Sequence, residues 1–379
     1  MVLLYKYGRK KVISVLKQLT LLQDWLKKEN VDGVFINDPD NVAYFSGYGS
    51  DPHERILALL VFKDSPPFLF VPALEKEDAL NSSWEYDVFA YLDHENPWSL
   101  IRQAVEKHIA RLTTLAIEKD FLTVSRLEQL KKEFTEITFS DVAPKIQSMK
   151  LIKTTDEIQK MIEAGKWADK ALEIGFKAIK EGVQEQEIVA EIEYELKKMG
   201  IKNMSFETMV LTGDNAASPH GVPGNRRIQK NDLVLFDLGV VHNGYTSDVT
   251  RTVAFGEPDD KAKEIYAIVL KANEAALAAV KPGITAGELD KIARDIITEA
   301  GYGEYFNHRL GHGLGRSVHE FPSIMEGNDF VVQEGMCFSI EPGIYVPGVA
   351  GVRIEDCLYV TADGCEVFTH TPKTYTVVS

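Results

Sequence analysis

The sequence predicts a chain of two domains: an α/β domain with a mixed sheet, followed by an α+β domain that contains an internal repeat. Three observations support this prediction. The chain has 379 residues, more than a single core of typical size holds. Short apolar runs alternate with helical patterns as far as about residue 141. A repeated pattern of helices, glycines and acids fills the remainder.

The first domain is predicted to span residues 1–147 and to begin with an amphipathic helix, because apolar residues recur at helical spacing from Val15 to Leu26. Short apolar runs then predict strands, and amphipathic stretches predict helices between or after them. The strands are expected at 33–37, 56–62, 68–71, 87–91, 114–118 and 136–139, and the helices at 73–80, 97–109 and 124–134. No glycine-rich phosphate loop follows these strands, so no dinucleotide site is expected.

The second domain is predicted to span residues 148–379, after a boundary between Pro144 and Lys150. It opens with a long helix that has a Thr or Asp cap and an acidic first turn, in the segment TTDE.

The second domain contains a faint internal repeat. Gly182 and Gly200 flank one predicted helix, and Gly283 and Gly301 flank another 101 positions later. Farther along, HGVP, FDLG and GYTSD correspond in the same order to HEFP, IEPG and GVRIE. Chance similarity is the alternative, but duplication explains why glycines, acids and histidines keep their order. A duplicated unit would bring the acids of both halves together.

Composition argues against two classes of partner. The net charge of −15, from 42 Lys and Arg against 57 Asp and Glu, would repel nucleic-acid phosphates. No window approaches the ~18–20 apolar residues of a membrane span, and basic residues interrupt the apolar N-terminal segment, so no signal peptide is expected. Cys337, Cys357 and Cys365 form no CxxC pair, so free thiols are expected. A cytoplasmic protein is therefore predicted.

The segment LVLFDLGVVHNGYTSDVTRT, which begins at Leu233, predicts a β-hairpin. Asn243-Gly244 between two apolar runs is typical of a two-residue type I′ turn. Such a turn pairs His242 with Tyr245 and thereby sets the register of every residue farther along the two strands.

This register places Asp237 and Asp248 on one face as diagonal neighbours, about 7–8 Å apart. Gly239 lies opposite Asp248 and is expected to leave space between the two aspartates. Two buried anions would repel each other and raise each other's pKa, and a multivalent cation would remove that repulsion. A solvated hairpin face with ordinary surface acids is the alternative.

The second half of the repeat supplies further metal-ligand types. Glu341 follows the apolar strand MCFSI, Glu355 is expected within the strand GVRIEDCLYV, and His312 lies between glycines that admit close backbone approach. With Asp237 and Asp248 they make four carboxylates and one imidazole, a set that suits the two divalent metals of a hydrolase. Oxygen-rich ligands favour Mn²⁺, with Co²⁺, Zn²⁺ or Fe²⁺ as alternatives.

Four segments resemble the signatures of the pita-bread metallopeptidases: FDLGVVHNGYTSDVTRT, RLGHGLGRSVHEFP, SIEPGIY and GVRIED. The resemblance spans essentially the whole chain. It implies a pita-bread catalytic domain with a pseudo-two-fold repeat, preceded by a creatinase/prolidase-like α/β domain. It also implies that the five metal ligands are Asp237, Asp248, His312, Glu341 and Glu355. Because the set is complete, it argues against a creatinase-like enzyme and against a metal-free binding module on the same fold.

The resemblance further implies roles in hydrolysis. A hydroxide that bridges the two metals would attack the scissile carbonyl, while Glu341 takes and returns its proton. His220 and His319 match two family histidines outside the ligand set; His319 would polarise the carbonyl and His220 would help to hold the substrate. Arg353 would orient ligand carboxylates, and a surface salt bridge is the alternative for it.

Within this family the chain is most similar to the compact prolidases, which implies a homodimer that hydrolyses Xaa-Pro dipeptides. Proline lacks a backbone N–H, so proteases that bind their substrate as an added strand handle it poorly. The alternative activity is that of aminopeptidase P, which removes the first residue from longer Xaa-Pro peptides.

One departure concerns the small peptide substrate. Some prolidases have an arginine after HExP, where this chain has Ser323, so another cation must hold a dipeptide's carboxylate. The candidates are Arg316 and two residues of the loop GSDPHER, His53 and Arg55. Family dimers bring this loop over a neighbouring active site, and a charged surface turn is the alternative.

Overall fold

The computed structural model describes residues 2–378, with side chains described from residue 16 onward. The chain divides into two units, of which the first ends at Met149 and the second begins at Lys150. None of the helices in the described residues combines the length and the apolar composition that a membrane span requires.

The N-terminal unit is an α/β domain built on one sheet. The elements of this region are α1 (Val2–Glu29), β1 (Gly33–Ile36), α2 (Pro39–Ser46), β2 (Ala58–Phe62), β3 (Phe68–Pro72), η1 (Ala73–Glu75), α3 (Lys76–Leu80), β4 (Asp87–Tyr91), α4 (Pro97–His108), β5 (Thr114–Ile117), α5 (Val124–Glu133), β6 (Thr138–Asp141) and α6 (Ala143–Leu151). The six strands lie in the order β4-β3-β2-β1-β5-β6. Because β2 is antiparallel to β1 and β3 while the other neighbours are parallel, the predicted mixed sheet is confirmed.

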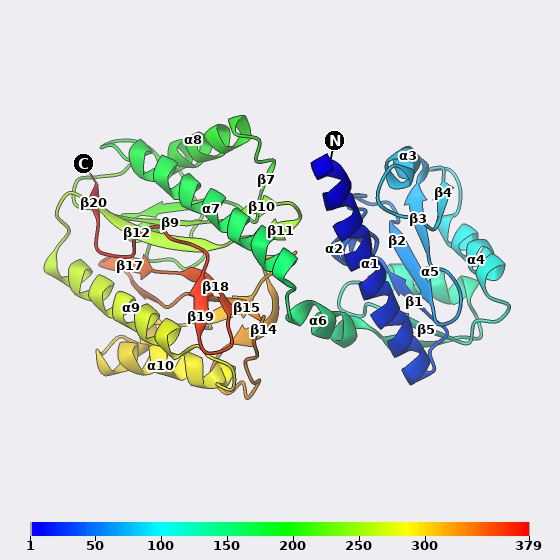
Figure 1. Ribbon diagram of the computed structural model, residues 1–379. Coiled ribbons are helices and arrows are strands. Elements are labelled where there is room, and N and C mark those ends of the chain that lie inside the picture. Colours follow the sequence, from blue (N-terminus) through cyan, green and yellow to red (C-terminus); the bar gives the residue numbers. More distant parts are fainter. Residues whose placement is uncertain (1, 379) are drawn as a thin grey trace. The chain divides into compact units, whose positions relative to one another are not determined.

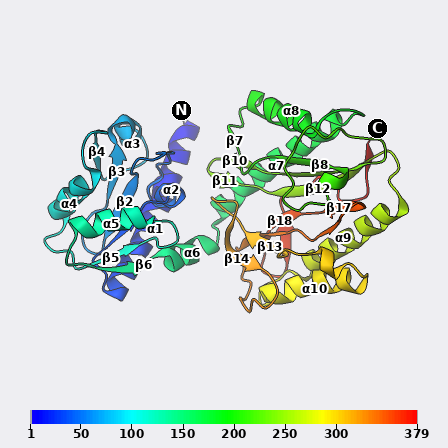
Figure 2. The same cartoon turned by 180° about the vertical axis from the view of Figure 1, so that it is seen from behind.

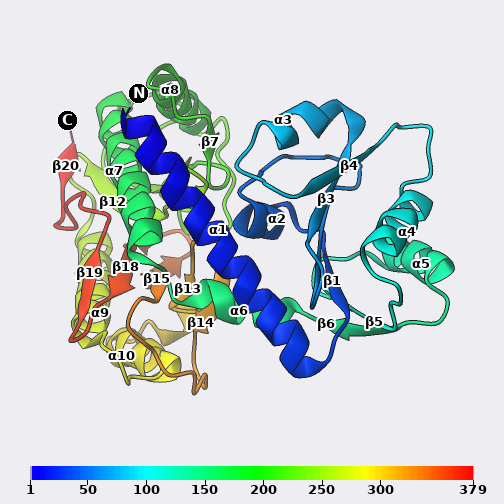
Figure 3. The same ribbon diagram turned by 45° about the vertical axis from the view of Figure 1, so that its right-hand side comes forward.

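Helices cover both faces of this sheet (Figure 3). Successive residues of a strand point to opposite faces. Accordingly, Val34 and Ile36 of β1 join a core cluster with Leu22 of α1, whereas Phe35 joins a second cluster with Ile101 of α4. The strands are therefore apolar on both faces, which explains why their sequences read as continuous hydrophobic runs.

Several features of this unit differ from the sequence-based expectation. Helix α2 was not expected, although Asp38 caps it by accepting from the N–H of Asp40 at 2.9 Å, and Gly47 ends it with a φ of 73°. Strands β2 and β6 each begin two residues later than expected, at Ala58 and Thr138. Helix α6 was not expected and lies where only the domain boundary was placed. These are short elements whose limits depend on contacts with the residues around them.

A buried glutamate gives this unit a measurable pH dependence. Glu118 follows β5 and is 1% exposed. Its carboxylate accepts from the backbone N–H groups of Asn37 and Asp38 (2.6 and 2.9 Å) and from Asn41 Nδ2 (2.7 Å). Burial nevertheless raises its pKa from 4.5 to about 7. The folded protein therefore retains a proton that the unfolded chain releases, and stability falls as the pH rises through this range.

Glu118→Gln is expected to remove this loss. Between about pH 5 and pH 8, wild type should lose about 2.5 kcal/mol relative to the variant, at ~1.36 kcal/mol for each pKa unit. Urea unfolding of both proteins across this range measures the difference. A difference that stays constant with pH would show that Glu118 ionises normally in the folded state.

The C-terminal unit is an α+β domain. Its elements are α7 (Thr155–Ala178), α8 (Glu185–Lys198), β7 (Asn203–Met204), β8 (Met209–Thr212), η2 (Gly213–Asn215), β9 (Leu233–Leu238), β10 (Val240–His242), β11 (Tyr245–Thr246), β12 (Val249–Phe255), α9 (Asp260–Ala279), α10 (Ala286–Glu299), η3 (Gly303–Tyr305), β13 (Gly311–Gly313), β14 (Glu320–Ile324), β15 (Cys337–Ile340), β16 (Gly343–Val346), β17 (Ala350–Arg353), β18 (Asp356–Val360), β19 (Cys365–Val367) and β20 (Val377–Val378). The larger sheets have the orders β20-β12-β9-β8 and β14-β13-β15-β18-β19. The strands lie between two helix pairs, α7 with α8 and α9 with α10 (Figures 1 and 2).

The two helix pairs correspond closely, as the internal repeat predicts. Helices α8 and α10 begin 101 positions apart and have equal lengths of 14 residues. A capping box opens each of them, with Glu187 in the first and Glu288 in the second. The glycines that precede these helices, Gly182 and Gly283, have φ values of 82° and 97°. Glycine adopts positive φ at a lower steric cost than any residue with a Cβ.

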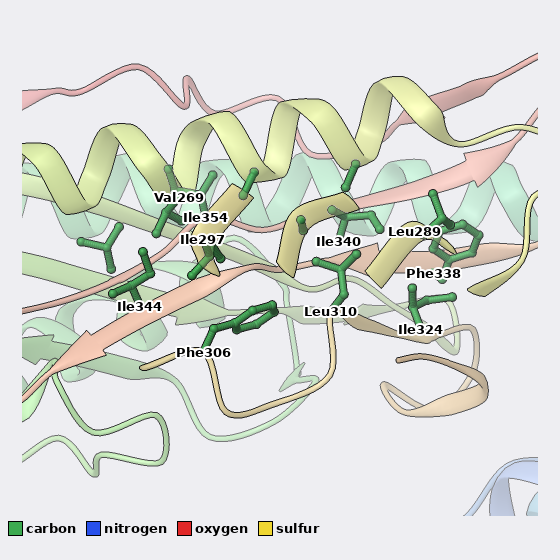
Figure 4. Packing of buried hydrophobic residues seen from close by; sticks show 14 of the residues in the cluster. Val269, Leu289, Ile297, Phe306, Leu310, Ile324, Phe338, Ile340, Ile344 and Ile354 are labelled. Carbon is green, nitrogen blue, oxygen red and sulfur yellow. The ribbon is translucent and has the colours of Figure 1, made fainter. Parts of the chain in front are cut away.

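Each helix pair buries its apolar face against strands of its own half. Ile188 and Ile192 of α8 pack with Phe236 of β9. In the second half, α9 and α10 cover a core that includes Val269, Leu289, Ile297, Phe338, Ile340 and Ile354 (Figure 4). Asp237 lies on β9 beside the first core, and Glu341 directly follows β15 beside the second.

Candidate metal centre

The Asn243-Gly244 hairpin has the predicted register. Both turn residues have positive φ, 52° and 77°, as a type I′ turn requires. His242 pairs with Tyr245, and the same register continues into β9 and β12, where Asp237 pairs with Thr250. Since Asp248 lies between β11 and β12, this register makes it the diagonal neighbour of Asp237.

Two local expectations are wrong. A Cβ at position 239 would lie 1.9 Å from the carbonyl oxygen of Ser247, so Gly239 admits the neighbouring backbone and does not leave space between the aspartates. Glu355 does not lie within a continuous strand but between β17 and β18. At this break its backbone N–H donates to Thr250 O at 3.0 Å. The break therefore joins the second half of the domain to the hairpin of the first.

The five predicted ligands gather at one place. Asp248, His312 and Glu355 each offer a ligand atom, and these atoms lie within 4.8 Å of one another. Glu341 Oε1 lies 3.3 Å from His312 Nε2, and Asp248 Oδ2 lies 3.6 Å from it. The charge of Asp237 helps to raise the pKa values of the other three carboxyl groups, so this residue faces the same cluster.

The cluster holds more negative charge than burial allows without a counter-charge. Burial, reinforced by the neighbouring carboxylates, raises the pKa values of Asp248 and Glu355 well above their usual range, and burial raises that of Glu341 to about 7. Three buried oxygens have no hydrogen-bond partner: Asp237 Oδ1, Asp248 Oδ1 and Glu355 Oε1. Buried polar atoms are seldom left this way, and cations would satisfy all three.

The tautomer of His312 fits a metal as well. Its Nδ1 lies 3.1 Å from Gly313 O, so Nδ1 carries the proton and Nε2 presents a lone pair to the carboxylates. Burial lowers the pKa of His312 to about 3, which keeps the ring neutral. A lone pair that faces carboxylate oxygens is repulsive unless a proton or a metal cation lies between them. The donor set therefore fits divalent metal ions.

Arg353 is the main cation beside the cluster. Its guanidinium pairs with Asp237 Oδ2 and donates to Thr250 Oγ1 at 3.1 Å and to Tyr345 OH at 2.8 Å. Thr250 in turn donates to Glu355 Oε2 at 2.7 Å. Arg353 is 4% exposed, so its pair with Asp237 lies within the protein and is not a surface salt bridge.

The two non-ligand histidines occupy different positions. His319 lies against His312, with ring centres 4.2 Å apart and planes inclined by 80°. Burial, together with the charge of Arg309, lowers the pKa of His319, which favours its neutral form. His220 is exposed. Its charge helps to lower the pKa of His308, so the two histidines lie near each other.

Sequence reasoning missed a chain of contacts behind the cluster. His308 Nε2 lies 3.0 Å from Tyr345 OH, which also accepts from Arg353, and Arg309 Nη1 donates to Ser323 Oγ at 2.9 Å. The available signals were the segments HRLGH and IEPGIY, in which a histidine precedes one ligand and a tyrosine follows another.

The three candidate substrate cations have partners of their own. Arg55 forms a two-point contact with Asp93, with Nε–Oδ1 and Nη2–Oδ2 distances of 2.8 and 2.9 Å. His53 is exposed, with a φ of 53°, and its Nδ1 lies 3.6 Å from Asp51 Oδ2. The guanidinium of Arg316 lies over the ring of Tyr245, 5.7 Å from its centre.

A duplicated α+β unit that gathers four carboxylates and one imidazole around unpaired oxygens defines a metal-dependent hydrolase. Comparison with known families agrees: residues 159–362 match Metallopeptidase family M24, and residues 18–152 match the Creatinase/Prolidase N-terminal domain. The chain belongs to metallopeptidase family M24 and has a creatinase/prolidase-type N-terminal domain.

Individual relatives match along nearly the whole chain. The Xaa-Pro dipeptidase of Lactobacillus helveticus is 56% identical over 362 residues, which cover 95% of this chain and 98% of that protein. Among solved structures, the prolidase from Pyrococcus horikoshii OT3 has a TM-score of 0.87 and 39% identity, and covers 96% of this chain and 99% of its own. The X-Pro aminopeptidase from Thermotoga maritima MSB8 has a TM-score of 0.83 and 31% identity, with coverage of 92% and 98%.

Proposed function

We propose that this metallopeptidase hydrolyses Xaa-Pro dipeptides at a centre of two divalent metal ions. The observation that carries the proposal is the buried cluster of Asp237, Asp248, His312, Glu341 and Glu355, whose unpaired oxygens and neutral imidazole fit cations. The substrate class is supported by the high identity to a relative named as an Xaa-Pro dipeptidase. Mn²⁺ is the first candidate because most of the ligand atoms are carboxylate oxygens.

In this proposal Glu341 and the residues outside the ligand set each have a distinct task. Bound divalent ions would supply Lewis-acid chemistry that activates water and polarises the scissile carbonyl. Glu341 accepts the proton of the attacking water and returns it to the leaving nitrogen. His319 is held against His312 in its neutral form and donates an N–H to the carbonyl oxygen as negative charge develops there. His220 contacts the substrate, and Arg353 keeps Asp237 oriented.

The carboxylate of a dipeptide requires a cation at the end of the binding site. His53, Arg55 and Arg316 are the proposed residues. Arg55 would have to exchange its contact with Asp93 for the substrate carboxylate.

The proposed assembly is a homodimer. The proposed location is the cytoplasm, which the unpaired state of all three cysteines supports.

Metal removal and substrate length test the proposal together. Protein stripped with a chelator is expected to be inactive, and Mn²⁺ should restore hydrolysis of an Xaa-Pro dipeptide such as Leu-Pro. The dipeptide should be preferred at least about tenfold, in kcat/KM, over the same sequence extended by one residue and over Leu-Ala, a difference of about 1.4 kcal/mol in transition-state binding.

Three outcomes would contradict parts of the proposal. Preference for the extended peptide would indicate aminopeptidase P activity, which the similarity to an X-Pro aminopeptidase makes the second candidate. Equal turnover of Leu-Ala would remove the requirement for proline. Hydrolysis that survives complete metal removal would exclude the metal-dependent mechanism.

A further inference from the structure

A second buried charge cluster lies next to the catalytic segment but takes no part in the proposed chemistry. The side chain of Glu320, the residue after His319, is 7% exposed. Its Oε1 lies 3.2 Å from Lys150 Nζ, and its Oε2 lies 3.2 Å from Lys153 Nζ. The side chains of these lysines are 12% and 3% exposed, so all three charges are largely removed from water.

The same carboxylate also binds the backbone before it. Glu320 Oε1 accepts from the N–H groups of Arg316 and Ser317, at 2.9 and 3.2 Å. Burial alone would raise the pKa of Glu320, but Lys153, Lys150 and these hydrogen bonds lower it to about 2. The two lysines and the backbone N–H groups therefore favour the charged form of Glu320.

The hairpin also contacts the segment between His312 and His319. Thr246 donates to Gly315 O through its backbone N–H at 2.8 Å and through Oγ1 at 3.1 Å. A Cβ at position 315 would lie 2.6 Å from Glu320 Oε2, so only glycine lets the carboxylate approach this closely. The backbone of residues 315–317 is thus held between the hairpin that carries the aspartates and the carboxylate of Glu320.

We propose that Glu320, held by Lys150 and Lys153, is a positioning residue that sets the place of His319 beside His312. The inference depends on the proposed role of His319 in hydrolysis. The ion pairs fix the carboxylate, the carboxylate fixes the backbone at Arg316 and Ser317, and that backbone leads directly to His319. Displacement of a catalytic group by about 1 Å can cost on the order of a hundredfold in rate.

Glu320→Gln keeps the size of the side chain and removes its charge. We expect kcat for Leu-Pro to fall by about 10- to 100-fold, while KM changes by less than about threefold, because His319 acts on the reacting carbonyl. Metal content should stay at the wild-type level. In the metal-free protein, amide hydrogen exchange of residues 313–320 should be faster than in wild type, because the amides lose a charged acceptor.

Asp32→Asn is the matched control. Asp32 lies in the N-terminal unit and likewise pairs with a lysine, Lys63 at 2.8 Å, and accepts from backbone N–H groups of Thr113 and Thr114. Loss of this carboxylate should lower the melting temperature without changing kcat or the exchange of residues 313–320. An equal loss of kcat in both variants would overturn the inference.

Lys153→Met provides a second test that does not depend on the folding of Glu320→Gln. It leaves Lys150 and the backbone hydrogen bonds in place, so kcat should fall less, and its effect should not add to that of Glu320→Gln in the double variant. Wild-type kcat and wild-type exchange in a folded Glu320→Gln or Lys153→Met protein would overturn the inference. Failure of wild type to cleave Leu-Pro would instead contradict the proposed function, and the exchange experiment would still decide whether Glu320 holds the segment.

Discussion

Asp248→Asn is expected to abolish hydrolysis and, at the same time, to raise the melting temperature of the metal-free protein. Asp248 is 4% exposed, and burial together with Glu355, Asp237 and Glu341 raises its pKa. Asparagine removes one of four crowded anions and one metal ligand. Activity should fall by more than about a hundredfold. Substitution of a residue that only hydrogen-bonds to a metal ligand costs up to about a hundredfold, and loss of a ligand itself should cost more.

The gain in stability should depend on pH. A carboxyl group with a raised pKa in the folded state destabilises the protein as the pH rises above its unfolded value. The metal-free variant should therefore exceed metal-free wild type by on the order of 1 kcal/mol near pH 8, and this advantage should shrink toward pH 4. Denaturation in the presence of a chelator, with metal content measured in parallel, tests both effects.

Asp295→Asn is a suitable control, because Asp295 lies on the solvent side of α10 and its side chain is 52% exposed. It should change neither activity nor metal content. Full metal occupancy with wild-type turnover in Asp248→Asn would exclude this carboxylate from the centre. A lower melting temperature of the metal-free variant at pH 8 would show that the anions of the cluster do not repel one another as argued.

Arg251→Met is expected to lower the free energy of unfolding more than the other substitutions considered, by about 3–5 kcal/mol. Removal of one partner from a buried ion pair usually has an effect of this size. Arg251 is 1% exposed and follows the hairpin on β12. It pairs with Asp356 Oδ1 at 2.6 Å and donates to the carbonyl oxygens of Thr371 and Thr250 at 2.8 and 2.9 Å and to that of Glu355. Methionine fills similar volume but satisfies none of these acceptors.

Urea unfolding of the metal-free protein measures this loss without interference from metal binding. Lys373 also pairs with Asp356, at 2.7 Å, so the carboxylate keeps one cation and the loss should lie at the lower end of the range. Arg102→Met serves as the control: Arg102 is 47% exposed and its ion pair with Glu106 should contribute less than about 1 kcal/mol. A loss of equal size in both variants would show that the buried position of Arg251 has no special cost.

The parts of the fold that were predictable are those with a strong local signal. The strands β1 to β5 are apolar on both faces, and the capping residues of α7 and α10 stand directly before apolar periodicity. The Asn243-Gly244 turn requires positive φ at both residues, and few residue pairs adopt it. These two residues were therefore enough to predict the register of Asp237 and Asp248.

The errors have a common physical cause. Gly239 and the break at Glu355 both depend on close approach of backbone from another strand, Ser247 in the first case and Thr250 in the second. Helix α2 has only eight residues, so its stability comes mainly from the unit that surrounds it. Contacts between segments that are distant in the sequence cannot be predicted from the residues next to a position.

Hydrophobic periodicity, turn chemistry and the order of acids and histidines are local properties, and they were enough to predict the fold class, the repeat and the residue types that could bind metal. Which charges balance one another became visible in the folded protein alone: Arg353 with Asp237, Arg251 with Asp356, and Lys150 and Lys153 with Glu320. The partners in each of these pairs are separated by about 100 residues or more. Electrostatic energy depends on distance in space and on burial, and both quantities are set by packing.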